Sequence, residues 1–226
     1  MAADTTSTPT SAASLPPFRP LPYKGPNIEV TRGAGKKRDH LYTPDLVPTV
    51  LIMCGQASLK SHDGGVSAVT LPDIRWKYCH IKAVTLLANV MLRQTALKTD
   101  GSYEAILLRD GEVTEGAASN VFIVRDGHIA TPPKDGSILP GITRDLLVEL
   151  LQEQGLDCQE RRIGEGELKA ADEIWLTGSM TGVAPVTRLN GEPVSGGNPG
   201  RLWRQASGWF HEYIDEYKRG GAAGSG

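Results

Sequence analysis

The hydrophobic pattern of the chain changes its period near Lys82. Residues 67–82 have the character of an extended segment, and from Ile74 to Lys82 alternate side chains fall on one face. After Lys82, apolar residues recur every three or four positions as far as Leu97, and Gly101 follows. This spacing predicts a strand that ends at Lys82 and a helix that ends at Gly101.

The remaining apolar patterns predict further strands and two more helices. Short apolar runs predict strands at residues 27–32, 47–54, 103–109, 121–125, 128–131 and 173–177. The dipeptides Asp110-Gly111 and Asp126-Gly127 are typical of tight hairpin turns. Leucines at helical spacing predict a helix at about residues 143–154, and a last helix is expected at about residues 200–217. The whole pattern predicts a mixed α+β protein.

Composition sets the boundaries of the predicted domains. Residues 1–26 are rich in Ser, Thr, Ala and Pro, and residues 219–226 in Gly and Ala, so we expect a disordered tail and a flexible tail at the two ends. Between them we expect a short N-terminal region at residues 27–60, a loose connection around Gly64, and one main domain at residues 66–218. A chain of 226 residues is long enough to bury a stable core.

Charge and cysteine content narrow the class of protein. The net charge of −2 gives no reason to expect nucleic acid or an anionic membrane as a partner. No apolar run approaches the roughly 20 residues that span a bilayer. The three cysteines are scattered, which indicates reduced thiols, and the N-terminus is unlike an import signal because its first basic residue is Arg19. These features predict a cytoplasmic protein with no metal site.

Two candidate residues for catalysis follow from their neighbours. Lys82 lies beside apolar and aromatic residues, and partial desolvation would free its amine to attack a carbonyl. The alternative is a surface lysine that reaches water. Glu115 precedes Gly116 and further small residues, so a planar ligand could approach its carboxylate closely. The alternative for Glu115 is an acidic hairpin turn.

Two further stretches could bind an anion. In residues 139–145 a loop enters the second predicted helix with Thr143 at its cap, so the backbone N–H groups of Ile142 and Thr143 could bind a phosphate. The glycine and hydroxyl residues around Ser179 could form a second phosphate-binding arm or a polar turn. Taken singly, each stretch leaves both interpretations open.

Taken together, the four stretches resemble the large domain of the fold-type IV pyridoxal-phosphate enzymes. The matching segments are I-K-A-V-x-L-L-A-N-V from Ile81, Y-E-A-I-L from Tyr103, V-T-E-G-A-A-S-N-V-F from Val113 and L-P-G-I-T-R-D from Leu139. The resemblance extends over about residues 28–217. It implies a mixed, barrel-like sheet with flanking helices, and a pyridoxal 5′-phosphate cofactor used for transamination.

The resemblance also implies a role for each matching residue. Lys82 matches the lysine that links covalently to the cofactor and moves the α-proton of the substrate. Glu115 matches the acid that bonds to the pyridine nitrogen and keeps it protonated, so that the ring can accept electrons. Ile142 and Thr143 match the backbone donors to the cofactor phosphate, and Ser179 matches a side-chain donor to it.

A further segment resembles the D-amino-acid aminotransferases within this class. Val30-Thr31-Arg32-Gly33, followed by Arg38 and His40, is similar to their V-T-R-G…R-x-H stretch. The resemblance implies a homodimer in which Arg38 and His40 reach in from the neighbouring subunit to hold the substrate carboxylate. A guanidinium suits that task, because it can donate two parallel hydrogen bonds to a carboxylate. The implied substrates are a D-amino acid such as D-alanine and a 2-oxo acid.

The sequence departs from the family at its N-terminal side. We find neither the H-x-x-R-L segment, whose arginine pairs with the cofactor phosphate, nor the G-x-Y-E stretch near it. We therefore expect a truncated small α/β domain and weakened cofactor binding, since a charge-assisted contact is typically worth about 1.5–3 kcal/mol. The alternatives are a catalytically silent binding or assembly protein of the same fold, an aminodeoxychorismate lyase, and a branched-chain aminotransferase.

Overall fold

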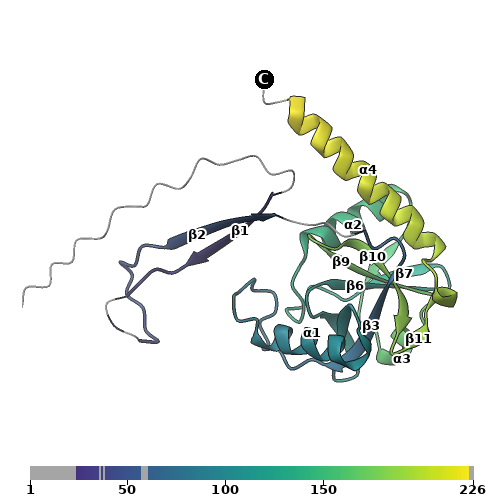
Figure 1. Ribbon diagram of the computed structural model, residues 1–226, viewed down its shortest axis with the longest axis horizontal. Helices are drawn as coiled ribbons and strands as arrows, with labels where there is room; N and C mark the ends of the chain where they lie inside the picture. Colours follow the sequence, from purple (N-terminus) through teal and green to yellow (C-terminus); the bar gives the residue numbers. More distant parts are fainter. Residues whose placement is uncertain (1–23, 36, 38, 57–60, 224–226) are drawn as a thin grey trace, which may run out of the picture. The chain divides into compact units, whose positions relative to one another are not determined.

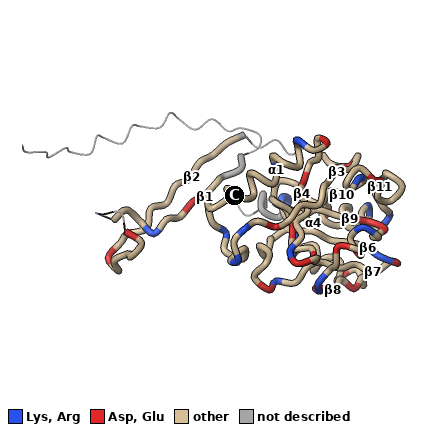
Figure 2. Tube along the Cα trace, turned by 90° about the horizontal axis from the view of Figure 1, so that it is seen from below, with Lys and Arg blue, Asp and Glu red and all other residues tan. Residues whose placement is uncertain are grey.

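The computed structural model describes residues 24–35, 37, 39–56 and 61–223 of the chain (Figure 1). The chain divides into two compact units, Met1–Ser58 and Leu59–Gly226. No helix in the described ranges is long and apolar enough to cross a bilayer. Acidic and basic residues are interspersed along the described part of the second unit (Figure 2).

The described residues of the first unit include an antiparallel strand pair, β1 (Lys24–Thr31) and β2 (Thr49–Gln56). Both strands were expected from the sequence, although β1 begins three residues before residue 27. The expected tail is therefore wrong at its last residues, because Lys24, Gly25 and Pro26 pair with Gln56, Gly55 and Cys54. The ladder hydrogen bonds of β2 hold these three residues in the strand.

The second unit is built around one curled mixed sheet. Its described strands are β3 (Val66–Pro72), β4 (Glu104–Arg109), β5 (Glu112–Gly116), β6 (Asn120–Arg125), β7 (His128–Thr131), β8 (Cys158–Glu160), β9 (Glu173–Gly178), β10 (Gly182–Leu189) and β11 (Glu192–Pro193). They lie in the order β5-β4-β3-β10-β9-β6-β7-β8, and β11 pairs with β10. The described helices are α1 (Leu87–Asp100), α2 (Ile142–Glu153), α3 (Glu165–Lys169), α4 (Arg201–Ala223) and the short 3₁₀ helix η1 (Ser195–Gly197).

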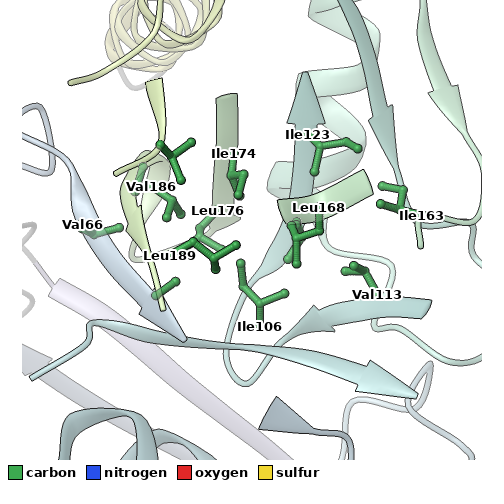
Figure 3. Close-up of a cluster of buried hydrophobic side chains, with 14 of the residues drawn as sticks. Val66, Ile106, Val113, Ile123, Ile163, Leu168, Ile174, Leu176, Val186 and Leu189 are labelled. Carbon is green, nitrogen blue, oxygen red and sulfur yellow. The ribbon is translucent and has the colours of Figure 1, made fainter. Parts of the chain in front are cut away.

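Alternate residues of the central strands pack on opposite faces of the sheet. Ile174 and Leu176 of β9 belong to the cluster inside the curl, where apolar side chains from several strands and α3 converge (Figure 3). Trp175, between them, packs on the other face with residues of α2 and α4. A third cluster joins α1 to β4 and its neighbours through residues such as Leu92 and Leu107. The period of two along each strand thus divides the core between two faces.

The strand expected to end at Lys82 is shorter than the alternation predicts. β3 ends at Pro72, and residues 73–86 lie outside any helix or strand. The Asp73 carboxylate accepts hydrogen bonds from both the backbone N–H and the guanidinium of Arg75. A short polar side chain that bonds to the backbone two residues later favours a turn over an extended chain. The prediction of an extended segment up to Lys82 is therefore wrong beyond Pro72.

Helix ends differ from the predictions in two places. Gly141, and not Thr143, is the N-cap of α2, and Thr143 lies inside the first turn. The last helix, α4, extends to Ala223, so part of the expected flexible tail is helical. Continuing an existing helix adds one hydrogen bond for each residue fixed, which lets a helix outlast its apolar pattern. At the other end of the unit, α1 ends as predicted at Gly101, whose φ of 75° is left-handed.

The hairpin turns are confirmed. Asp110 and Gly111 have φ of 53° and 79°, and Asp126 and Gly127 have φ of 50° and 80°, as a two-residue hairpin turn requires. The first of these turns leads into β5, a strand that the sequence analysis did not predict. Glu115 therefore lies within a strand instead of in an acidic turn.

Candidate active site

Glu115 is buried in β5, and its carboxylate is held from three sides. The residue is 5% exposed. Oε2 accepts hydrogen bonds from Asn120 Nδ2 at 3.0 Å and from the backbone N–H of Leu139 at 3.0 Å. Oε1 pairs with the guanidinium of Arg75. A carboxylate offers about four lone-pair positions, so these three donors leave one position on Oε1 for a further N–H donor.

The position of Glu115 perturbs its ionisation. Burial raises the pKa of this carboxyl to about 7, and the charge and hydrogen bond of Arg75 and the N–H of Leu139 oppose that rise. The carboxylate of Asp73 adds a smaller contribution in the same direction as burial. A carboxyl with this pKa exists in both protonation states near neutral pH, which is typical of a functional group in a site.

Asn120 is a site residue that the sequence analysis missed. Its Nδ2 donates to Glu115 and, at 2.8 Å, to the carbonyl oxygen of Leu139. The side chain thereby joins β5 to the loop that precedes α2. Gly141 packs against Asn120 so closely that a Cβ there would overlap Oδ1 of the amide. The asparagine within the V-T-E-G-A-A-S-N segment was the available signal, because a buried amide needs specific partners.

The N-terminus of α2 lies beside this carboxylate and can hold an anion. Within the described part of the chain, the backbone N–H groups of Ile142 and Thr143 donate to no protein acceptor. The N-cap is a glycine without a side chain to occupy them. Free N–H groups and the positive end of the helix dipole together favour a phosphate or carboxylate.

Ser179 is brought toward the same place by the sheet. It lies in the turn between β9 and β10, and its side chain is exposed. Two residues earlier, Thr177 is the cross-strand partner of Asn120. The Thr177 hydroxyl is buried and has no hydrogen-bond partner among the described residues. The end of β9 and the turn after it therefore carry two hydroxyl groups, those of Thr177 and Ser179. They lie next to β6, the strand that carries Asn120.

Lys82 lies on a loop that is fixed at both ends next to Glu115. Before Lys82, the guanidinium of Arg75 donates to the carboxylate of Glu115. It also donates to the carbonyl oxygen of Ser137, at 3.2 Å. After it, Asn89 Nδ2 donates to the carbonyl oxygen of Ala117 at 2.7 Å. Lys82 itself is exposed and forms no hydrogen bond or ion pair with a described residue. The fold thus brings the lysine loop to β5 without fixing the lysine side chain.

The two residues expected to bind the substrate carboxylate belong to the first unit. His40 is exposed in the loop between β1 and β2. Arg38 lies outside the described residues. Their roles therefore stay predictions. Within the second unit, the fold brings together Glu115, the first turn of α2 and the β9–β10 turn, and it adds Arg75 and Asn120 to the set.

A curled mixed sheet with a buried carboxylate next to a helix N-terminus is the arrangement expected of the fold-type IV enzymes. Comparison with known families gives the same class. The model of class IV aminotransferases matches residues 16–189. The chain belongs to the class IV aminotransferase family. It has the fold expected from the sequence, that of the fold-type IV enzymes.

Individual relatives point to the same family. The chain is 41% identical to a D-alanine aminotransferase from Bacillus licheniformis over 177 residues, which are 77% of this chain and 62% of that protein. A branched-chain aminotransferase from Thermoproteus uzoniensis, solved with norvaline, has a TM-score of 0.68 and 26% identity, with 82% of this chain and 63% of that one covered. An aminotransferase from Brucella abortus bound to PLP has a TM-score of 0.67 and 27% identity, with coverages of 74% and 60%. The chain thus spans somewhat under two thirds of the length of these relatives.

Proposed function

We propose that the chain catalyses a pyridoxal-phosphate-dependent transamination, with a D-amino acid such as D-alanine as donor and a 2-oxo acid as acceptor. The observation that carries this proposal is the carboxylate of Glu115. It is buried, it is fixed by three donors, and it keeps one lone pair free beside a helix N-terminus. The identity to D-alanine aminotransferase supports the choice of donor.

The described residues fit the cofactor at two of its polar ends. The free lone pair of Glu115 suits the N–H of a protonated pyridine ring. The unused backbone N–H groups of Ile142 and Thr143 suit a phosphate, with the Ser179 side chain as a further donor. Gly141 leaves the approach to these N–H groups free of a Cβ. When bound, pyridoxal 5′-phosphate supplies a ring that takes up the electrons of the substrate Cα–H bond.

We assign a separate role to each residue of the site. Glu115 would hold a proton on the ring nitrogen, and Asn120 and the backbone N–H of Leu139 hold the Glu115 carboxylate in place. Lys82 would bind the cofactor covalently through Nζ and would carry the proton that leaves the substrate Cα. An amine can accept this proton only in its neutral form.

The exposure of the lysine loop supports a homodimer as the working form. Six large apolar side chains on the loop and the start of α1 are between about half and three quarters exposed: Ile81 49%, Val84 73%, Leu86 51%, Leu87 75%, Val90 56% and Met91 52%. A contiguous apolar surface of this kind marks an association site. We infer that a second copy covers it, and that Arg38 and His40 of that copy hold the substrate carboxylate.

The proposal is tested by fixing the cofactor in place. The chain is incubated with pyridoxal 5′-phosphate, reduced with borohydride, digested and mapped by mass spectrometry. We expect the phosphopyridoxyl group on Lys82. Recovery of an unmodified Lys82 peptide from a chain that had bound the cofactor would contradict the assignment, and a chain that binds none would be the silent scaffold.

Turnover and substrate class are tested separately. D-alanine and L-leucine are compared as amino donors with 2-oxoglutarate as acceptor, and sedimentation measures the oligomeric state in parallel. We expect D-alanine to be the better donor. A preference for L-leucine would favour a branched-chain aminotransferase, to which the structural likeness with the Thermoproteus uzoniensis enzyme points.

A further inference from the structure

Behind Glu115 lies a chain of buried charges that the proposed function does not use. Asp73 accepts from Nε and Nη2 of Arg75, both at 2.9 Å, and its Oδ2 is also 2.9 Å from Nη2 of Arg109. The side chains of Asp73, Arg75 and Glu115 are 0%, 5% and 6% exposed. Arg109 is the exposed end of this series, at 25%.

The charges of this series balance only when Glu115 is ionised. Arg109, Asp73, Arg75 and Glu115 alternate in sign, so two positive groups meet two negative ones. Protonation of Glu115 would leave a net positive charge among buried groups, which is costly where water is excluded. The other groups that face Glu115, the amide of Asn120 and the N–H of Leu139, are neutral donors and also favour the charged carboxylate.

The guanidinium of Arg75 is held in one orientation. Besides Asp73 and Glu115 it donates to the carbonyl oxygen of Ser137 at 3.2 Å and to Thr114 Oγ1 at 3.4 Å. Thr114 Oγ1 in turn donates to Asp73 Oδ2 at 2.9 Å. A planar fork with partners on several sides cannot rotate freely, and a lysine could not reproduce these contacts.

We propose that Arg75 is a positioning residue for Glu115: it favours the charged form of this carboxylate against the effect of burial, and it fixes the orientation of the carboxylate so that one lone pair of Oε1 stays free for the cofactor. This inference rests on the proposed function for the identity of the ring. A proton shared between Glu115 and a pyridine nitrogen resides on the stronger base. By lowering the basicity of Glu115, Arg75 favours retention of the proton on the ring, where it assists the withdrawal of electrons. Asp73 works against this effect, because it neutralises part of the charge of Arg75.

The test uses the full chain without cofactor, so that it does not depend on turnover. The Glu115 carboxyl is followed by ¹³C NMR of glutamate-labelled protein as the pH is varied, and Glu115→Gln identifies its signal. We expect Arg75→Gln to raise the pH of titration by roughly 1–3 units, as loss of an adjacent opposite charge does. Arg75→Lys, which keeps the charge, is expected to give a smaller rise. Asp73→Asn should lower the pH of titration by about one unit, because a like charge is lost.

The opposite signs separate an electrostatic role from a structural one. A general loosening of the site by either substitution would move the titration of Glu115 in the same direction in both variants. Arg162→Gln is the matched control, since Arg162 pairs with the half-buried Glu112 on the same strand as Glu115. Unchanged titration in Arg75→Gln, or a rise in Asp73→Asn, would overturn the inference.

A second readout uses the loaded chain. The visible absorbance of the bound cofactor is titrated in the wild type and in Arg75→Lys. We expect the ring to lose its proton at a lower pH in the variant than in the wild type. Borohydride mapping of Lys82 in the wild type tests the proposed function alone. A wild type that binds no cofactor would therefore refute that function, while the NMR titration still decides the role of Arg75.

Discussion

The two sides of the candidate site differ in how firmly the fold holds them. Glu115 lies inside the sheet, and each of its carboxylate oxygens has at least one donor from the second unit. Lys82 lies on a loop between Pro72 and α1, exposed and without a polar partner in the described ranges. The difference shows that the sheet pre-organises the groups proposed to bind the ring and the phosphate, whereas a loop carries the amine proposed to react.

This division has a physical reason. A buried carboxylate must have its hydrogen bonds made by the protein, because an unsatisfied buried charge is strongly destabilising. A lysine on a surface loop has water as its partner and needs no such support. The loop also carries the exposed apolar residues that we expect a second copy to cover. Final placement of Lys82 is therefore expected to follow association and cofactor binding.

The largest effect is expected on the loop side. Lys82→Ala removes the amine that we propose binds the cofactor covalently, so we expect no borohydride-fixed cofactor and no detectable turnover. Lys77→Ala is the matched control, because Lys77 is exposed on the same loop. Adduct formation at another residue in Lys82→Ala, with turnover retained, would show that the loop is not catalytic.

The next effect is expected on the sheet side. Glu115→Gln keeps the shape of the side chain but cannot hold a proton on the ring nitrogen as a charged partner does. We expect turnover to fall by about 10²–10³-fold, the range for loss of one pre-organised electrostatic contact, with cofactor binding largely retained. Steady-state rates and the visible absorbance measure the two quantities. Glu112→Gln, at a half-buried position on the same strand, should leave both unchanged.

Residues that the sequence placed well are those with a local signal. The turns at Asp110-Gly111 and Asp126-Gly127 and the helix end at Gly101 follow from backbone conformations that few residues adopt. The strand at Glu173–Gly178 follows from its apolar run. The family, and with it the fold, followed from motifs spread over the chain and is confirmed by the match to residues 16–189.

Features that depend on tertiary contacts were not predicted. The strand β5 has no clear alternation, because it is fixed by pairing with β4 and not by its own pattern. The turn after Pro72 depends on the contact between Asp73 and Arg75, which overrides the alternation around Trp76. The bridge that Asn120 makes joins residues far apart in the sequence. The period of apolar residues along the sequence carries no information about such contacts.

The pH dependence of the unfolding free energy should again distinguish the Glu115 side of the site from the Lys82 side. The pKa of Glu115 in the folded chain is raised to about 7 from 4.5, chiefly by burial. A raised carboxyl pKa means that its contribution to stability is present below pH 4.5 and is lost as the pH rises through about 7. At about 1.4 kcal/mol per pH unit, the loss in the cofactor-free chain is on the order of 3 kcal/mol.

Urea unfolding between pH 4.5 and 8 measures this loss. We expect Glu115→Gln to flatten the decline of the unfolding free energy over that range. Lys82→Ala should leave the decline in place, because the Lys82 side chain makes no polar contact within the described residues. An equal decline in wild type and Glu115→Gln would show that another group is responsible.

The smallest effect concerns the glycine that lets α2 approach Asn120. A Cβ at Gly141 would overlap Oδ1 of Asn120, so in Gly141→Ala the amide must move away from Glu115 and Leu139. Forced displacement of a well-packed group costs typically 1–3 kcal/mol, and we expect a loss of about that size in the unfolding free energy. Cofactor affinity should fall as well, because the carboxylate loses one of its three fixed donors.

Gly164→Ala gives this prediction a control with the same backbone. Gly164 is the N-cap of α3, with φ of −75° and ψ of 153°, and Gly141 is the N-cap of α2, with φ of −72° and ψ of 134°. A Cβ at Gly164 would meet no atom within 4 Å. The general cost of alanine at an N-cap is therefore common to both variants, and their difference isolates the contact with Asn120. Equal losses of stability and unchanged cofactor affinity in the two would mean that Asn120 can move without disturbing Glu115, and that the sheet side of the site is held less firmly than its hydrogen bonds indicate.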